Sequence, residues 1–186
     1  MQRCAWAVSE ISIKYHDQEW GVPLHDDQKL FEFLVLEGAQ AGLNWETILK
    51  KRAAYREAFD QFDPVKVADY KSEKIDQLLS NPGIIRNRLK IKSSIRNAQV
   101  YLKIQAEFGS FDQFLWNYVD GRPIQNKFHS LSEIPAQTNL STQISMDLKT
   151  RGMNFVGPTI MYAYMQAVGL VNDHVVDCFR YNELMN

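Results

Sequence analysis

The only two cysteines lie near opposite ends of the chain, and each has a histidine at a spacing typical of metal ligands. His16 follows Cys4, and His174 precedes Cys178 at an i, i+4 spacing that would place both side chains on one face of a helix. Two thiolates and two imidazoles form a closed tetrahedral set that suits zinc and leaves no position for water. The sequence therefore predicts one structural Zn²⁺ that joins the termini. The alternative is two isolated buried thiols.

Length and composition favour one folded domain over residues 1–186. A chain of this size buries about 70% of its unfolded surface, so it has a core without help from a metal. The first residues contain no apolar stretch like a signal peptide, and the longest aliphatic run, Leu34 to Leu36, is far too short to span a bilayer. We expect a monomeric cytoplasmic protein with no membrane partner and with reduced thiols.

Charge is informative in its distribution and not in its sum. The net charge of −1 does not indicate a nucleic-acid partner. From Gln77 to Ala106, however, there is no acidic residue, while six residues are basic: Arg86, Arg88, Lys90, Lys92, Arg96 and Lys103. Such a stripe can neutralise DNA phosphates, although a solvated helix face is the ordinary alternative.

The elements that must position these residues are nearly all predicted to be helical. Asp26 and Asn44 can cap helices, and Asp63 precedes a proline at a first helical position. Further helices are expected to begin near Ser72, to run through Ile91, Ile95, Ala98 and Leu102 up to Gly109, to cover Phe111 to Val119, to start at a Ser141 cap, and to run from Pro158 to near Gly169. A polar connector covers residues 120–140. No segment alternates with a period of two, so the expected class is all-α.

The turn between the last two of these helices has the composition of a phosphate-binding site. Glycines near both helix boundaries, Gly152 and Gly157, can present backbone N–H groups at the start of the second helix, where an anion is favoured. The segment about 141–169 resembles a helix-hairpin-helix, the DNA-backbone clamp of a large DNA glycosylase superfamily. A plain turn between two helices is the alternative.

Four segments make a closer resemblance, and they occupy residues 15–23, 36–45, 81–91 and 155–174. They are similar to the signature blocks of the bacterial 3-methyladenine DNA glycosylase I family, and with the flanking cysteines they cover essentially the whole chain. The resemblance implies an all-α helix-hairpin-helix fold whose termini, residues 4–16 and 174–178, are joined by zinc. It also implies a bacterial enzyme that flips N3-methyladenine out of double-stranded alkylated DNA and hydrolyses its glycosyl bond, leaving an abasic site.

The resemblance assigns the base pocket to aromatic residues. Tyr15, Trp20 and Trp45, with Trp6 as a further candidate, match positions that line it. Electron-rich rings attract a cationic base by about 0.5–2 kcal/mol per contact. Ordinary core packing is the alternative for each ring.

Glu37 is the predicted catalytic residue. Its surroundings, Phe33 to Ala39, are otherwise apolar, so a carboxylate there should be partly buried and need a partner or a purpose. By resemblance it accepts hydrogen bonds from the exocyclic amine of the flipped base and complements the cationic ring. A glutamate at a helix end, turned to water, is the alternative.

Base flipping also requires that the duplex gap be filled and the strand held. The turn from Gln40 to Leu43, which includes Gly42, resembles the family's intercalating loop, with Leu43 as the wedge, and the alternative is a linker with Leu43 packed inward. Arg88, Arg151 and Gly157 are the predicted contacts to the DNA backbone.

Two positions depart from the family pattern. Ser12 stands where relatives often have an aromatic residue. Asp173 is near the place of the superfamily's catalytic aspartate, but we interpret it as structural because its neighbour is a predicted metal ligand.

Two other functions are possible for such a sequence. One is a non-enzymatic helical DNA-binding module joined by zinc, and the other is a zinc hydrolase, against which four protein ligands argue.

Overall fold

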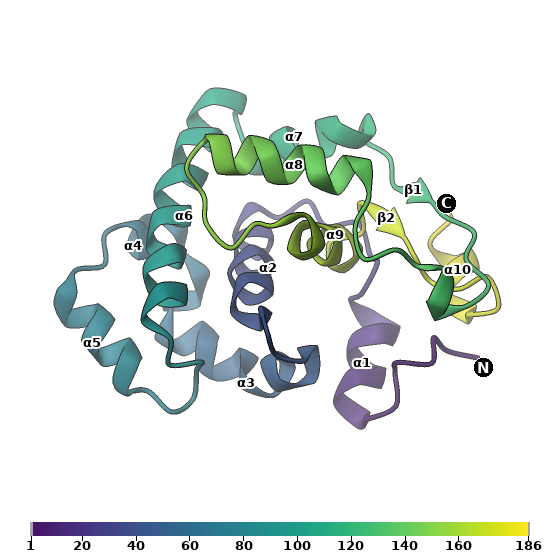
Figure 1. Ribbon diagram of the computed structural model, residues 1–186, viewed down its shortest axis with the longest axis horizontal. Coiled ribbons are helices and arrows are strands. Elements are labelled where there is room, and N and C mark those ends of the chain that lie inside the picture. The colour runs from purple at the N-terminus through teal and green to yellow at the C-terminus, as the bar shows by residue number, and fades with distance from the viewer. Residues whose placement is uncertain (1, 186) are drawn as a thin grey trace.

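The computed structural model describes residues 2–185, which are mostly helical (Figure 1). The helices are α1 (Glu10–Gln18), α2 (Asp27–Gln40), α3 (Trp45–Ala58), η1 (Asp60–Phe62), α4 (Pro64–Ala68), α5 (Ser72–Ser80), α6 (Arg88–Phe108), α7 (Phe111–Trp116), η2 (Asn117–Val119), η3 (Leu131–Glu133), α8 (Asn139–Thr150), α9 (Pro158–Ala167) and α10 (Phe179–Glu183). Two short strands, β1 (Ile124–Gln125) and β2 (Val171–Asn172), pair in parallel. The helical class is confirmed, and this small ladder is a feature that the all-α prediction lacked. No helix in the described part of the chain has both the length and the apolar character needed to cross a membrane.

The predicted helix starts are largely confirmed by their caps. Asp26, Asn44 and Asp63 each accept hydrogen bonds from backbone N–H groups in the first turn of the helix that follows. The predicted cap at Ser141 is wrong, because Thr138 caps α8 and Ser141 is its reciprocal partner in a capping box. Ser12 plays the same part for α1, whose helix we did not predict, so this departure from the family pattern has a local structural role.

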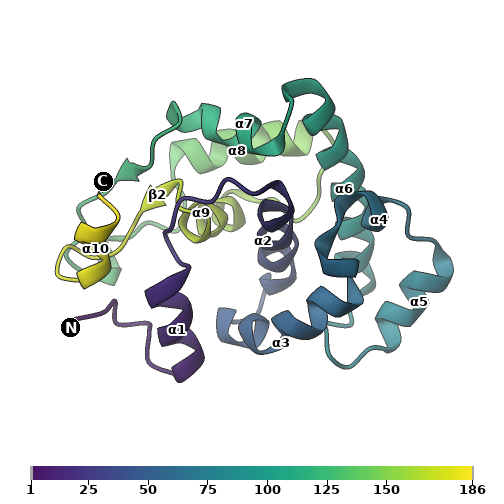
Figure 2. The same cartoon turned by 180° about the vertical axis from the view of Figure 1, so that it is seen from behind.

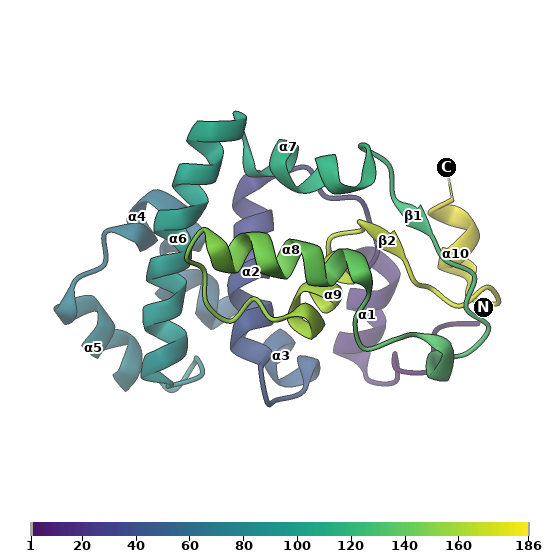
Figure 3. The same cartoon turned by 45° about the horizontal axis from the view of Figure 1, so that its top comes forward.

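Helix α2 runs through the middle of the molecule, with α3 to α6 on one side and α1, α9 and α10 on the other (Figures 1 and 2). Every residue of α2 from Leu30 to Ala39 is buried. Helix α8 lies across α9 (Figure 3), and the amino-terminal segment joins α10, where the Phe179 N–H donates to the Gln2 carbonyl at 3.0 Å. The carboxyl-terminal end of α2 thus leads from the core to the turn that contains Leu43.

A tight turn after α9 fixes α9 against the segment that follows α1. Gly169 has φ +75°, and its α-carbon lies against the backbone of Val22 and Pro23. The Gly21 N–H donates to the Gln166 carbonyl at 3.1 Å, and Leu24 N–H donates to Val168 at 3.1 Å. These contacts set the position of α1 relative to α9.

We predict that Gly169→Ala is far more costly than Gly121→Ala. A methyl group at Gly169 would lie 2.4 Å from the Val22 carbonyl carbon, whereas one at Gly121, with φ +70°, would meet no atom within 4 Å. Gly121→Ala should therefore cost about 1–2 kcal/mol of stability from backbone strain, and Gly169→Ala about 2–5 kcal/mol in total. Urea unfolding of both variants measures the difference, and equal losses would mean that the two segments can move apart freely.

Candidate functional site

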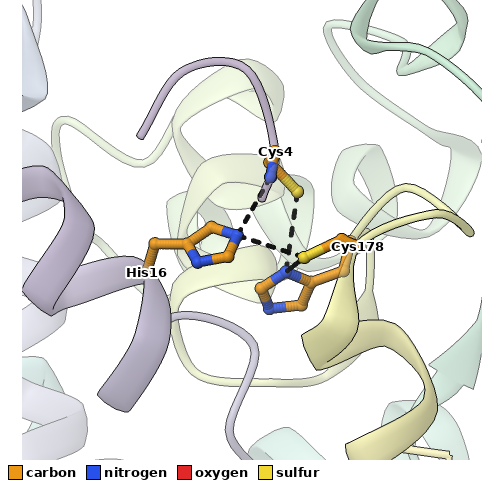
Figure 4. A group of neighbouring side chains, drawn as sticks. Cys4, His16 and Cys178 are labelled. Atoms are coloured by element: carbon orange, nitrogen blue, oxygen red, sulfur yellow. Dashed lines mark hydrogen bonds between the residues drawn. The ribbon is translucent and has the colours of Figure 1, made fainter. Parts of the chain in front are cut away.

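The structure brings together the four predicted metal ligands from both ends of the chain. Cys4, His16, His174 and Cys178 are all buried, and one ligand atom of each lies within 4.8 Å of the others. Figure 4 shows Cys4, His16 and Cys178 pointing toward one another from three separate segments. The predicted helical face for the last pair is wrong, since His174 and Cys178 lie in the turn between β2 and α10 and Cys178 is the N-cap of α10.

The spacing of these ligand atoms fits a tetrahedral ion. The Cys4 Sγ lies 3.6 Å from the His174 Nδ1, and the Cys178 Sγ lies 3.4 Å from the His16 Nε2 and 3.5 Å from the His174 Nδ1. Around zinc, with sulfur at about 2.3 Å and nitrogen at about 2.0–2.1 Å, a tetrahedral sulfur–nitrogen edge is about 3.6 Å. The cluster could therefore hold a metal ion with all four positions filled by protein.

Each imidazole of the cluster has a hydrogen-bond partner at the ring nitrogen that faces away from the other ligands. The Nδ1 of His16 lies 2.8 Å from a carboxylate oxygen of Asp17, which is itself held by Arg3 at 2.8 Å. The Nε2 of His174 lies 3.0 Å from the Trp20 carbonyl oxygen. Such partners fix the tautomer of a metal-binding histidine and direct its other nitrogen at the ion.

The predicted base-binding residues surround one cavity of about 380 Å³. Trp6, Tyr15, Trp20 and Trp45 line it together with Glu37. Its remaining lining residues are Gln40, Leu131, Ile134, Ala163 and Gln166. The cavity is thus formed by residues that lie far apart in the sequence. Most of them come from the amino-terminal segment, α1, α2, α3 and α9.

Two walls of this cavity rest on the metal cluster. The Trp20 ring packs edge-on against His174 with centroids 4.6 Å apart, and the Trp6 ring packs against His16 at 5.2 Å. Trp6 and Trp20 also contact each other at 5.1 Å. The positions of these indoles therefore depend on the histidines of the cluster.

Glu37 is the buried carboxyl of the cavity, with 4% of its surface exposed. Burial raises the pKa of Glu37 to about 8, so the group is largely neutral at pH 7 when the cavity is empty. A carboxyl pKa above its ordinary value of 4.5 means that the neutral form contributes stability, fully present below about pH 4.5 and lost as the pH rises to about 8. A cation placed beside Glu37 would reverse this preference and favour the carboxylate.

Two further polar atoms at the cavity have no partner within residues 2–185. The Tyr15 hydroxyl and the Trp45 indole N–H are both buried and make no hydrogen bond. Burial and then the charge of Glu37 raise the pKa of Tyr15 well above its ordinary range, so the hydroxyl remains protonated. Buried donors without acceptors are costly, which is expected of a site that is completed by a ligand.

The predicted wedge turn is exposed as its role requires. Leu43 is 43% exposed, and Gly42, with φ +79°, has open space around its α-carbon. The turn is held from beneath by Lys90, whose Nζ donates to the Ala39 carbonyl at 2.8 Å and to the Ala41 carbonyl at 2.7 Å. The ammonium group of Lys90 therefore binds the protein backbone and is not free to contact a DNA phosphate, as the basic stripe of residues 86–103 had suggested.

The predicted backbone contacts differ in how available they are. Arg88 is exposed and makes only a long contact of 3.4 Å with Asp76. The Arg151 guanidinium is engaged by Glu107 at 2.6 Å and Asp147 at 2.9 Å, and it also lies over two phenylalanine rings. Arg151 as a DNA contact stays a prediction, but its donors already have partners.

The turn between α8 and α9 is shaped by α6. Asn97 donates to the Asn154 carbonyl at 2.8 Å and accepts from the Asn154 N–H at 2.9 Å, and Arg96 donates to the Gly152 carbonyl. Gly157 is the N-cap of α9 and supplies no side-chain cap. Within residues 2–185, no side chain thus caps the first-turn N–H groups of α9.

Gln40 and Gln166 are cavity residues that the sequence analysis missed. No motif singles out a glutamine on a helix, and only the position of α9 beside α2 brings Gln166 to the cavity. Asp173, interpreted as structural, lies behind Gln166 and accepts its amide N–H at 2.7 Å.

Comparisons with known proteins agree with this arrangement. A family model described as methyladenine glycosylase matches residues 6–181. The chain is 50% identical to DNA-3-methyladenine glycosylase 1 of Escherichia coli K12, over 97% of each chain, and 48% identical to the DNA-3-methyladenine glycosylase of Haemophilus influenzae, over 95% of this chain and 96% of the relative. The chain also resembles a solved structure of 3-methyladenine DNA glycosylase I from Staphylococcus aureus, which is described as showing the structural basis of 3-methyladenine recognition. The TM-score is 0.93 at 42% identity, and 96% of each chain is covered.

We predict that Cys178→Ser lowers metal content and thermal stability together. Binding energy at a site formed only in the folded protein is folding energy. A loss of about 2–5 kcal/mol, comparable with removal of a native disulfide, corresponds to a fall in Tm of roughly 4–20 °C. A chelator should lower the Tm of the parent and leave that of the variant almost unchanged. A variant that keeps one equivalent of metal and the parent melting curve would refute the four-ligand site.

Proposed function

The chain belongs to the methyladenine glycosylase family, and we propose that it excises N3-methyladenine from alkylated DNA by hydrolysis of the N-glycosyl bond. The products are the free base and an abasic site. The observation that carries the proposal is the buried carboxyl of Glu37 in a cavity walled by four aromatic side chains.

This cavity suits a base that carries positive charge. N3-methyladenine is cationic while it is attached to DNA, and the faces of tryptophan and tyrosine attract a desolvated cation. Glu37, neutral in the empty cavity, ionises when the cation enters, so that charge is matched only in the bound state. A neutral, undamaged adenine gives no such gain, because Glu37 then stays protonated and no charge pair forms.

The same charge explains why the site needs little chemical machinery. The base departs as neutral 3-methyladenine, so the leaving group does not require a proton from an acid. Glu37 and the aromatic rings hold the cationic base, and water captures the sugar cation and releases one proton to the solvent. The contribution of the protein is mainly recognition and orientation.

For DNA binding we propose that double-stranded DNA lies across the face that carries Leu43. Leu43 fills the space left by the flipped base, with Gly42 allowing the close turn. Helices α8 and α9 act as a helix-hairpin-helix, with the N–H groups beside Gly157 receiving a phosphate. Arg88 is one available cation of the stripe, because its contact with Asp76 is long and exposed, and Arg151 contacts DNA only if it exchanges a carboxylate for a phosphate.

We further propose that the cluster holds one Zn²⁺ in a monomeric protein of the bacterial cytoplasm. Cys4, His16, His174 and Cys178 would supply all four ligands, so the ion would cross-link the fold and have no role in hydrolysis. This speaks against a zinc hydrolase. A non-enzymatic DNA-binding module would have no use for the unpartnered donors of Tyr15 and Trp45 in a buried cavity.

Incubation with methylated duplex DNA should release 3-methyladenine, identified by chromatography, and leave the strand uncut until alkali is added. Strand-cutting glycosylases attack the sugar with a lysine amine. In the described part of the chain no lysine lines the cavity, and Lys90, although near, donates to two backbone carbonyls. Absence of free base would reject the function. A borohydride-trapped protein–DNA adduct that disappears on mutation of a single lysine would reject the mechanism.

Glu37→Gln cannot ionise, so it should weaken binding of a cationic methylated adenine such as 3,9-dimethyladeninium by about 10- to 100-fold and reduce excision, while affinity for undamaged duplex stays near that of the parent. The variant should fold well, because glutamine resembles the neutral carboxyl of the empty cavity. Glu46→Gln, at a half-buried glutamate in the first turn of α3 that pairs with Lys50, is the matched control and should bind the cation as the parent does. Equal affinity for the cation in Glu37→Gln and the parent would remove Glu37 from base recognition.

A further inference from the structure

Helix α9 contributes a polar side chain to the cavity, Gln166, and the buried carboxylate of Asp173 holds this side chain from behind. We propose that Gln166 reads the base and that Asp173 fixes its amide so that the oxygen, and not the nitrogen, faces the cavity. Asp173 is then a positioning residue for the specificity of the site. This inference rests on the proposed function and adds a second reader to Glu37.

Asp173 is a fixed acceptor. It is 1% exposed and accepts three hydrogen bonds, from the Tyr162 hydroxyl at 2.5 Å, the Gln166 Nε2 at 2.7 Å and the Asn126 Nδ2 at 2.7 Å. Burial and then Asp173 itself raise the pKa of Tyr162, which therefore keeps its proton and remains a donor. Both carboxylate oxygens are thus satisfied by neighbouring donors.

This acceptor determines which end of the Gln166 amide is free. A carboxamide has one donating and one accepting end, and only the donating end can face a carboxylate. The amide nitrogen is bound to Asp173, and no residue from 2 to 185 donates a hydrogen bond to the Oε1 of Gln166. The main chain of Gln166 is also held, since its carbonyl accepts from Gly21 at 3.1 Å.

The cavity therefore offers the Gln166 oxygen, which accepts in every state, and the Glu37 carboxyl, which accepts with both oxygens once it ionises beside a cationic base. The exocyclic amine of adenine has two N–H donors, one for each acceptor. The corresponding atom of 3-methylguanine is an oxygen, which would face these acceptors with its lone pairs and leave them unpaired. Because both methylated bases are cationic in DNA, the aromatic walls attract them alike, and the two acceptors must distinguish them.

The test measures binding of free 3-methyladenine and free 3-methylguanine by tryptophan fluorescence. Gln166→Met keeps the length of the side chain and removes the amide, so the Kd for 3-methyladenine should rise about 10-fold while that for 3-methylguanine stays constant or falls. Asp173→Asn can donate as well as accept, which lets the Gln166 amide turn over, and it should also reduce the preference for 3-methyladenine. In the double variant the two effects should not add, because they act through one amide.

Gln105→Met on α6 is the matched control: the same substitution at a glutamine whose amide also donates to a carboxylate, Asp27 at 2.6 Å, but which does not line the cavity. It should leave the ratio of the two Kd values unchanged. Melting curves and metal content identify any variant that is misfolded, and Asp173→Asn and Gln166→Met provide independent readings if one of them is. A folded Gln166→Met variant with the parent ratio would overturn the inference, as would an equal change of the ratio in Gln105→Met. A parent protein that releases no 3-methyladenine from methylated DNA would instead reject the proposed function.

Discussion

The closure of the chain at the Cys/His cluster is the constraint on which the active cavity depends. Cys4 and His16 come from the amino-terminal segment and α1, and His174 and Cys178 from the turn before α10. Closing them on one point fixes the orientation of both imidazoles, and two indoles of the cavity pack on those rings. A contact between sequence-distant segments thus determines the shape of a pocket that is built mostly from other helices. The metal would act on recognition through geometry and have no part in the chemistry.

The buried carboxyl of Glu37 is a second constraint on the cavity, and it acts through electrostatics. Placing it on the central helix, among apolar residues, raises its pKa and makes its charged form costly in the empty protein. A cationic base repays that cost, whereas a neutral base does not. Selectivity then arises from coupling between the proton on Glu37 and the charge of the base, and the unpartnered Tyr15 and Trp45 donors extend the same principle to hydrogen bonding.

Local signals predicted the local structure well, and contacts between distant segments account for what they missed. A helix cap such as Asp26 or Asn44 depends only on residues within the next turn, and both of these caps were predicted correctly. The resemblance to a family identified the four aromatic residues and Glu37, which the structure gathers around one cavity. The partners of Lys90 and Arg151, and the anchoring of Gln166 by Asp173, depend on how helices pack. The helical interpretation of His174 and Cys178 failed because a turn brings side chains four residues apart together as readily as a helix does.

The pKa of Glu37 with and without a cationic base tests the account most directly. Its side-chain carboxyl carbon can be followed by NMR during a pH titration, alone and with 3,9-dimethyladeninium, which carries the charge of the damaged nucleoside and has no bond to hydrolyse. The account predicts a midpoint of about 8 in the empty protein and a much lower midpoint when the cation is bound. A midpoint near the ordinary value of 4.5 in the empty protein, or one that the cation leaves unchanged, would contradict it.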